Sequence, residues 1–324
     1  MVPITDCADW RLRDEDHCSS ACFARPHISE CHTIPAPAED FVATFKLPQK
    51  GSGRLALLHP MPREDRITFD EASHTYTVDG IKVPRSVTGF LHEYASEFDP
   101  ALAIQTMKAG KYWGEKKAAF EAQGLGTEDA DFLRRWAFNG EVARSRGHLL
   151  HYQAEQMCNG RQVQEPHSPE FQQARQIYAR LLEKGLTPFR AEVNLFHVGL
   201  VLAGQPDLLM MDPAGDLAIV DWKRSKNIRF EGDRTLQDPL GHLPDTNYFL
   251  YSLQLNVYRY MLESEYGYRC SSMWLAVVHP DNDQPRLISC PRMDAEIAAI
   301  VDFEFECGRA KAAAVPGNDA RFVV

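Results

Sequence analysis

Long apolar runs are absent from this 324-residue sequence, and no targeting segment is recognisable at its start. No stretch reaches the roughly 18–20 apolar residues that a membrane-spanning helix needs, so we expect no membrane span. A basic segment followed by an apolar one is missing, and the early acids argue against an organellar transit peptide: Asp6, Asp9, Asp14, Glu15 and Asp16. We therefore expect an intracellular, soluble protein of the cytoplasm or nucleus, whose cysteines are thiols or metal ligands before disulfides.

Positive charge is also scarce, since 35 basic and 45 acidic residues give a formal net charge of −10. This balance does not exclude a nucleic-acid-binding protein. A site for divalent cations concentrates carboxylates, and phosphate binding needs only a local basic patch. The phosphate-loop pattern G-x-x-x-x-G-K-[ST] does not occur, which argues against an attached helicase motor.

The composition changes near residue 66. Residues 1–65 have little periodicity and many prolines, so we expect an irregular Cys/Pro-rich extension, followed by one domain over 66–314 and a tail over 315–324. The extension contains Cys7, Cys18, Cys22 and Cys31. The Cys18–Cys22 spacing is within the range of zinc sites, but the other spacings match no familiar finger. Free thiols are therefore favoured over a structural Zn²⁺ site, which stays an alternative.

The periodicity from residue 66 onward predicts an α/β domain with a helical N-terminal part. Asp79-Gly80 is a plausible turn of a hairpin over 67–83, and Ser86 and Asp99-Pro100 are typical helix starts. The further elements expected are helices over 100–158, 168–185, 248–265 and 295–314, strands over 189–196, 207–211, 217–223, 270–279 and 285–289, and a polar loop over 224–247. This order indicates a mixed central β-sheet flanked by helices.

Asp207, Asp221 and Lys223 form the central constellation of candidate catalytic residues. Asp221 and Lys223 are two residues apart on one strand, so their side chains lie on the same face. A five-residue loop over 212–216 would pair Met211 with Leu217 and place Asp207 opposite Asp221, whereas a four-residue loop would put Asp207 on the other face. Facing carboxylates suit Mg²⁺ or Mn²⁺, and a neighbouring lysine can orient the attacking water or neutralise charge on a phosphate. The alternative is an exposed hairpin with a salt bridge.

Five segments in this order resemble the PD-(D/E)xK nucleases, and specifically their RecB-like exonuclease branch, which includes the phage-type and mitochondrial genome-maintenance exonucleases. The segments are Pro84–Thr88, Gly147-His148-Leu149-Leu150-His151, Gly204-Gln205-Pro206-Asp207, Asp221-Trp222-Lys223 and Gln254-Leu255-Asn256-Val257-Tyr258. His148 departs from the pattern, because a threonine is expected there. A single D-x-K occurs often by chance, so the order of the motifs carries the resemblance.

The resemblance implies a restriction-endonuclease-like core and metal-dependent DNA cleavage that leaves a 5′-phosphate, in repair, recombination or replication. By the same resemblance, His151, Asp207 and Asp221 would hold Mg²⁺ or Mn²⁺, with the Trp222 carbonyl and Glu192 as further donors. Lys223 would be the catalytic lysine, with Gln254 and Tyr258 shaping the site and contacting nucleic acid. For single residues the alternatives are ordinary ones: a structural histidine at 151, a solvated strand residue at 192, and a packing stripe at 254 and 258.

Basic residues near these motifs are candidate contacts to the DNA backbone. Arg224 and Lys226 follow the lysine strand, and Arg144 and Arg146 precede Gly147. Charged residues in loops are usually just solvated, but this placement favours DNA contact. We expect an exonuclease acting on single-stranded DNA or DNA ends. The alternatives are a structure-selective endonuclease and a non-catalytic nucleic-acid-binding module, although the latter would be expected to lose at least one residue of the central constellation.

Overall fold

The computed structural model describes residues 53–309. The cysteine-containing segment that the sequence marks as a zinc candidate, together with the 315–324 tail, lies outside this range. In the part of the chain that the structure describes, no helix is long and apolar enough to cross a membrane.

A five-stranded mixed sheet forms the centre of the domain, in the order β11-β10-β9-β8-β5. Strands β9 and β10 are parallel, and the other neighbours are antiparallel. The bounds are β5 Thr187–Ala191, β8 Leu208–Met211, β9 Leu217–Arg224, β10 Cys270–Val278 and β11 Arg286–Cys290. The α/β class with a mixed central sheet is therefore confirmed.

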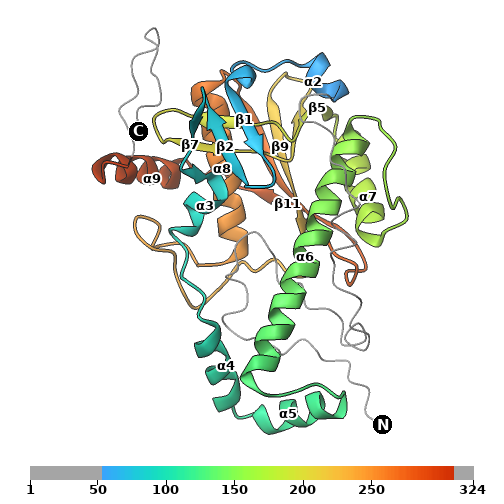
Figure 1. The fold of residues 1–324 in the computed structure, drawn as a ribbon. Helices are drawn as coiled ribbons and strands as arrows, with labels where there is room; N and C mark the ends of the chain where they lie inside the picture. Colours follow the sequence, from blue (N-terminus) through green and yellow to red (C-terminus); the bar gives the residue numbers. More distant parts are fainter. Residues whose placement is uncertain (1–52, 310–324) are drawn as a thin grey trace.

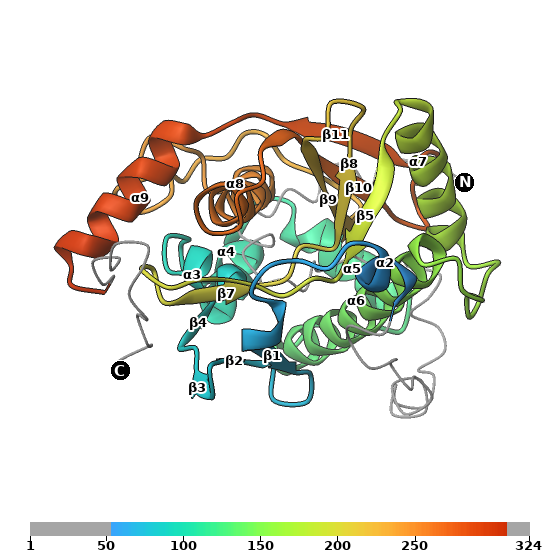
Figure 2. The ribbon, with the colours of Figure 1, turned by 90° about the horizontal axis from the view of Figure 1, so that it is seen from above.

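Helices cover both faces of this sheet because its strands alternate between two apolar clusters. Val220 and Trp222 belong to the cluster that includes residues of α6 (Asp129–Cys158) and α7 (Pro169–Glu183). Ile219 belongs to the opposite cluster, with α3 (Val87–His92), α8 (Asn247–Glu265) and α9 (Asp294–Glu306). Figure 2 shows the sheet between α8 and α7. The alternation leaves Asp221 and Lys223 on the α8 face.

Two smaller sheets lie beside the central one, in the orders β1-β2-β3 and β4-β7-β6. Their strands are β1 Ile67–Asp70, β2 Thr75–Val78, β3 Ile81–Lys82, β4 Arg85–Ser86, β6 Leu195–His197 and β7 Leu202–Gly204. Asp79 (φ 51°) and Gly80 (φ 82°) make the expected turn between β2 and β3. Ser86 caps α3, since its Oγ accepts a hydrogen bond from the Gly89 N–H at 3.1 Å.

The first half of α6 extends beyond the sheet and carries α4 (Pro100–Ala109) and α5 (Trp113–Ala122) at its end, as Figure 1 shows. Asp99 caps α4, with Pro100 at the first helical position. This part has its own apolar cluster of Ile104, Met107 and Phe132, against which Trp113, Phe120 and Trp136 pack. Trp113 and Trp136 are each partly buried by this packing.

Three expectations about local structure need correction. The segment over 1–65 is not irregular throughout, because α2 (Arg54–Leu58) and a 3₁₀ turn at Glu64–Arg66 fold there, and Leu55 is buried in the α6–α7 cluster. The strand expected over 189–196 is interrupted between β5 and β6, because Glu192 adopts a left-handed backbone with φ 50°. The last helix ends at Glu306, before Gly308 at φ 66°.

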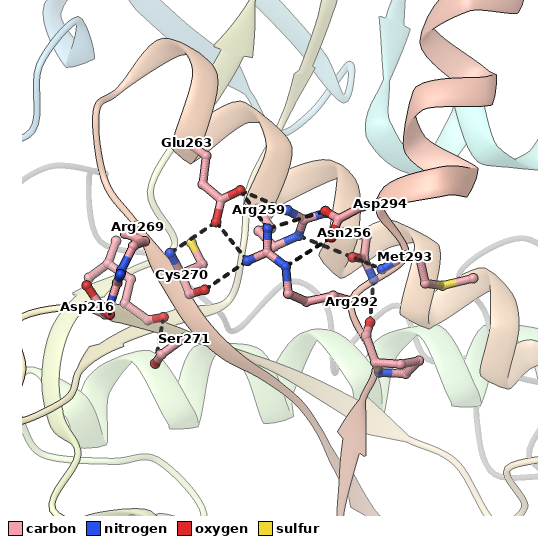
Figure 3. A network of polar contacts seen from close by, with 12 residues as sticks. Asp216, Asn256, Arg259, Glu263, Arg269, Cys270, Ser271, Arg292, Met293 and Asp294 are labelled. Atoms are coloured by element: carbon pink, nitrogen blue, oxygen red, sulfur yellow. Dashed lines mark hydrogen bonds and ion pairs between the residues drawn. The ribbon is translucent and has the colours of Figure 1, made fainter.

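A network of polar contacts fixes α8 relative to β10 and α9 (Figure 3). Arg259 pairs with Glu263 at 2.8 Å and with Asp294 at 2.7 Å, and its own side chain is 4% exposed. The Asn256 Oδ1 accepts from the Met293 N–H at 2.9 Å. These contacts come from α8 residues that follow Gln254 by two to nine positions, so they fix the helix that carries Gln254.

Candidate active site

Asp207 and Asp221 face each other at the end of the β8–β9 hairpin. Met211 pairs with Leu217 and Leu208 with Val220, so the register places Asp207 opposite Asp221, as the five-residue loop predicts. Both carboxylates are buried, at 8% and 2% exposure. The Trp222 N–H donates to the Asp207 Oδ2 at 2.6 Å, which holds the Asp207 carboxylate against the β9 backbone.

His151 and Glu192 complete a cluster of candidate metal ligands around Asp207. His151 follows Leu150, which is buried in the α6–α7 cluster. Its Nδ1 lies 3.2 Å from the Asp207 Oδ1 and 3.6 Å from the Glu192 Oε1. Among the described residues, one donor atom each of His151, Glu192 and Asp207 lie within 4.8 Å of one another. Burial acts to lower the pKa of His151, but the two carboxylates outweigh it and raise that pKa well above its usual value.

Glu192 reaches this cluster through a bend in the backbone. Its N–H donates to the Asp207 carbonyl at 3.0 Å, and its carbonyl accepts from the Gln205 Nε2 at 2.6 Å. These bonds hold a non-glycine residue at positive φ, a conformation that costs about 1–3 kcal/mol. Strain of this kind concentrates at functional sites, so the bend favours a ligand over an ordinary strand residue at this position.

Lys223 lies between a carboxylate and an amide. Its Nζ is 2.8 Å from the Asp221 Oδ2 and donates to the Gln254 Oε1 at 3.1 Å, and it lies 4.5 Å from the centre of the Tyr251 ring. Burial raises the pKa of Asp221 to about 6, and Asp207 adds to this rise while Lys223 opposes it. The charged form of the Asp221 side chain is therefore unfavourable in the absence of a cation. This is expected of a metal ligand, because a bound cation would compensate the charge.

Gln254 and Tyr258 share one face of α8, and only Gln254 is accessible. The Gln254 Nε2 donates to the Thr88 Oγ1 at 3.1 Å and to the Tyr258 hydroxyl at 3.4 Å. Tyr258 is 3% exposed, so its burial favours a positioning role over direct contact with nucleic acid. Burial raises the pKa of Tyr258 well above its usual value, with Tyr76, Asp221 and Asp207 contributing.

Two further residues near the site are not among the site residues expected from the sequence. Thr88 lies within the segment 84–88 of the family pattern, but its partner Gln254 is 166 residues away. Tyr76 comes from β2, and burial raises its pKa, with Glu192 and Asp207 as further causes. The only sequence signal for Thr88 is the motif itself, and Tyr76 has none.

Gly204 has a steric role that explains the glycine of the Gly204–Asp207 motif. A Cβ added there would lie 2.7 Å from the Tyr258 Cε1 and 2.7 Å from the Val87 Cγ2. Real Cβ atoms essentially never come so close. Strand β7 therefore needs a glycine so that α3 and α8 can pack together above it.

The structure gives each basic candidate a carboxylate partner. Arg224 forms a buried ion pair with Glu170 at 2.9 Å, so its guanidinium is not presented to solvent. The other three are more accessible and pair as Lys226 with Asp281 at 3.0 Å, Arg144 with Glu141 at 2.8 Å and Arg146 with Glu165 at 3.0 Å. Of the four, Arg224 therefore fits a structural role best.

The donor set fits a hard divalent cation. Oxygen atoms of Asp207 and Glu192 and a nitrogen of His151 converge. Within residues 53–309, the buried Asp221 Oδ2 accepts no hydrogen bond of normal geometry, although the Lys223 Nζ lies 2.8 Å away. Carboxylate oxygens are the ligands that Mg²⁺ and Mn²⁺ prefer, whereas zinc sites favour sulfur and nitrogen. Of the four cysteines in the described residues, Cys158, Cys270 and Cys290 are buried and Cys307 is exposed.

This geometry is that of a carboxylate-rich cation site on a mixed α/β sheet. A family model of the PD-(D/E)XK nuclease superfamily matches residues 148–304, an interval that includes His151, Asp207, Asp221, Lys223 and Gln254. Over these residues, just under half of the chain, the protein is similar to the PD-(D/E)XK nuclease superfamily. A nuclease fold implies a nucleic acid as the class of substrate. The narrower assignment to the RecB-like branch stays a prediction.

Solved structures resemble the chain only distantly. The crystal structure of SSO0001 is 14% identical over 61% of this chain and 73% of its own, with a TM-score of 0.25. A candidate exonuclease from Eubacterium rectale is 13% identical over 74% of this chain and 80% of its own, with a TM-score of 0.27. Scores this low say nothing about substrate or mode of action. Among curated proteins, the chain has no match.

Proposed function

We propose that this protein is a Mg²⁺- or Mn²⁺-dependent deoxyribonuclease, and more narrowly an exonuclease that acts on single-stranded DNA or DNA ends. The observation that carries the proposal is the placement of Lys223, which is 2.8 Å from Asp221 and beside the carboxylate pair that Asp207 completes. A salt bridge on an exposed hairpin would not bury two facing carboxylates at 8% and 2% exposure.

His151, Asp207 and Asp221 would hold the cation, with Glu192 and the Trp222 carbonyl as further donors. When bound, the cation would supply Lewis-acid polarisation of the scissile phosphate and a lowered pKa for a nearby water. Lys223 keeps a positive charge where negative charge grows on the phosphate during attack, and its position is fixed by Asp221 and Gln254. The product would be a 5′-phosphate.

The preference for DNA ends is supported by the order of the motifs, which resembles the RecB-like exonucleases. The accessible basic residues Arg144, Arg146 and Lys226 supply charge for a phosphate backbone, although each also has a carboxylate partner. The same core can serve endonucleases, so the mode of cleavage needs a direct test.

The test is digestion of 5′- and 3′-labelled single- and double-stranded DNA, linear and circular, with Mg²⁺, Mn²⁺ or EDTA. We expect metal-dependent loss of linear DNA only, with polarity given by the label. Lys223→Ala should lower the rate by about 10²-fold or more, whereas Lys184→Ala, at the exposed end of α7, should leave it unchanged. Cleavage of circles would indicate an endonuclease. Binding without cleavage of DNA or RNA under any metal would leave only a binding module.

A further inference from the structure

Thr88 lies at a fixed position next to the proposed active site. It is in the first turn of α3, which the Ser86 side chain caps through the Gly89 N–H. Its neighbour Val87 is fully buried in the core that α3 shares with α8. The Thr88 hydroxyl is thus presented to Gln254 by a short helix that is held at its start and along its buried face.

The Gln254 amide connects this hydroxyl to Lys223. Its Nε2 donates to Thr88 at 3.1 Å and to the Tyr258 hydroxyl at 3.4 Å, and its Oε1 accepts from the Lys223 Nζ at 3.1 Å. An amide has one donating and one accepting end. If the amide turned over, its NH₂ group would face an ammonium that also only donates. The ammonium therefore selects which end of the amide faces it, and the Thr88 and Tyr258 hydroxyls hold the amide in this place by accepting from its NH₂ end.

We propose that Thr88 is a positioning residue for Lys223 and acts through Gln254. The role rests on the proposed nuclease function, in which Lys223 touches the reacting phosphate. Asp221 holds the ammonium on one side, and the Gln254 carbonyl oxygen holds it on the other. Without the Thr88 hydroxyl, the NH₂ end of the amide loses the shorter of its two described contacts and is left with the 3.4 Å contact to Tyr258. The amide then rotates, and Lys223 loses the acceptor that sets its direction.

The test uses Thr88→Val, which keeps the shape of the side chain and removes the hydroxyl, and Thr88→Ser, which keeps the hydroxyl. Both are made in the full chain, alone and combined with Gln254→Leu. We expect Thr88→Val to lower kcat roughly ten-fold, because small misplacements of a catalytic group have effects of this order. KM, and the Kd for DNA in EDTA, should stay within about two-fold, and Thr88→Ser should retain most of kcat.

Two further readouts separate positioning from a general structural role. In the Gln254→Leu background, Thr88→Val should change kcat by less than about two-fold, because the connection is already broken. In EDTA, urea unfolding of the four proteins of this cycle should show a coupling of about two-fold or more in the unfolding constant, as expected for side chains in direct contact.

The outcomes distinguish this proposal from the function on which it rests. An inactive wild-type chain overturns the nuclease function and the positioning role together. An active wild type with unchanged kcat in Thr88→Val overturns the positioning role alone. A ten-fold loss that persists in the Gln254→Leu background would also overturn the positioning role, because Thr88 would then act independently of Gln254. A change in KM and DNA affinity instead of kcat would overturn it too, because Thr88 would then contact the substrate itself.

Discussion

Asp221→Asn should stabilise the metal-free protein above pH 6. Asp221 is 2% exposed, and its pKa is raised from 3.8 to about 6. Between these two values the folded protein keeps a proton that the unfolded chain has released, so the free energy of unfolding falls as pH rises through this window. Asparagine carries no charge at any pH and avoids this loss.

The magnitude follows from the pKa difference. A shift of about two units, at about 1.36 kcal/mol per unit, corresponds to roughly 2–3 kcal/mol at pH 8. For a domain of this size that is a rise in Tm of roughly 5–10 °C. At pH 4 the wild-type carboxyl in the folded protein is protonated, so the two proteins should differ little.

The assay is urea and thermal unfolding in EDTA at pH 4 and pH 8. Added Mg²⁺ should raise the stability of the wild type by mass action and that of Asp221→Asn much less. Asp216→Asn is the matched control, because the Asp216 carboxylate pairs with the exposed Arg269. Loss of such a surface pair should change stability by about 0–1 kcal/mol. If Asp221→Asn is no more stable than the wild type at pH 8 in EDTA, the reasoning about the buried carboxylates is wrong.

Two further predictions concern packing around the site. Gly204→Ala should lower the free energy of unfolding by about 1–3 kcal/mol and reduce nuclease activity, because the new Cβ would meet Tyr258 and Val87 at 2.7 Å; unfolding like the wild type in urea would contradict this. Glu170→Gln should destabilise the protein by roughly 3–5 kcal/mol, because it leaves the buried charge of Arg224 without its partner. A loss of DNA affinity at unchanged stability would instead restore Arg224 as a backbone contact.

The parts of the site that depend on local geometry could be predicted from the amino-acid sequence. Side chains on a strand alternate with a period of two, so Asp221 and Lys223 were expected on one face, and a five-residue loop over 212–216 was expected to place Asp207 opposite Asp221. The choice between this loop and a four-residue one came from the observed Met211–Leu217 pairing. Ser86 and Asp99 predicted the starts of α3 and α4, since a cap bonds only to backbone a few residues away. The parallel pairing of β9 with β10 across α8 completes the expected mixed sheet.

Which of these residues meet, and which are accessible, depends on how the helices pack on the sheet. Glu192 reaches Asp207 through a left-handed bend that its residue type does not predict. Arg224 is removed from the surface by Glu170, 54 residues earlier, and Thr88 meets Gln254 across 166 residues. Contacts between residues so far apart in the sequence arise from the packing of α3, α7 and α8 on the sheet. A strand or helix pattern fixes the face on which a side chain lies, and the partner on that face comes from elsewhere in the chain.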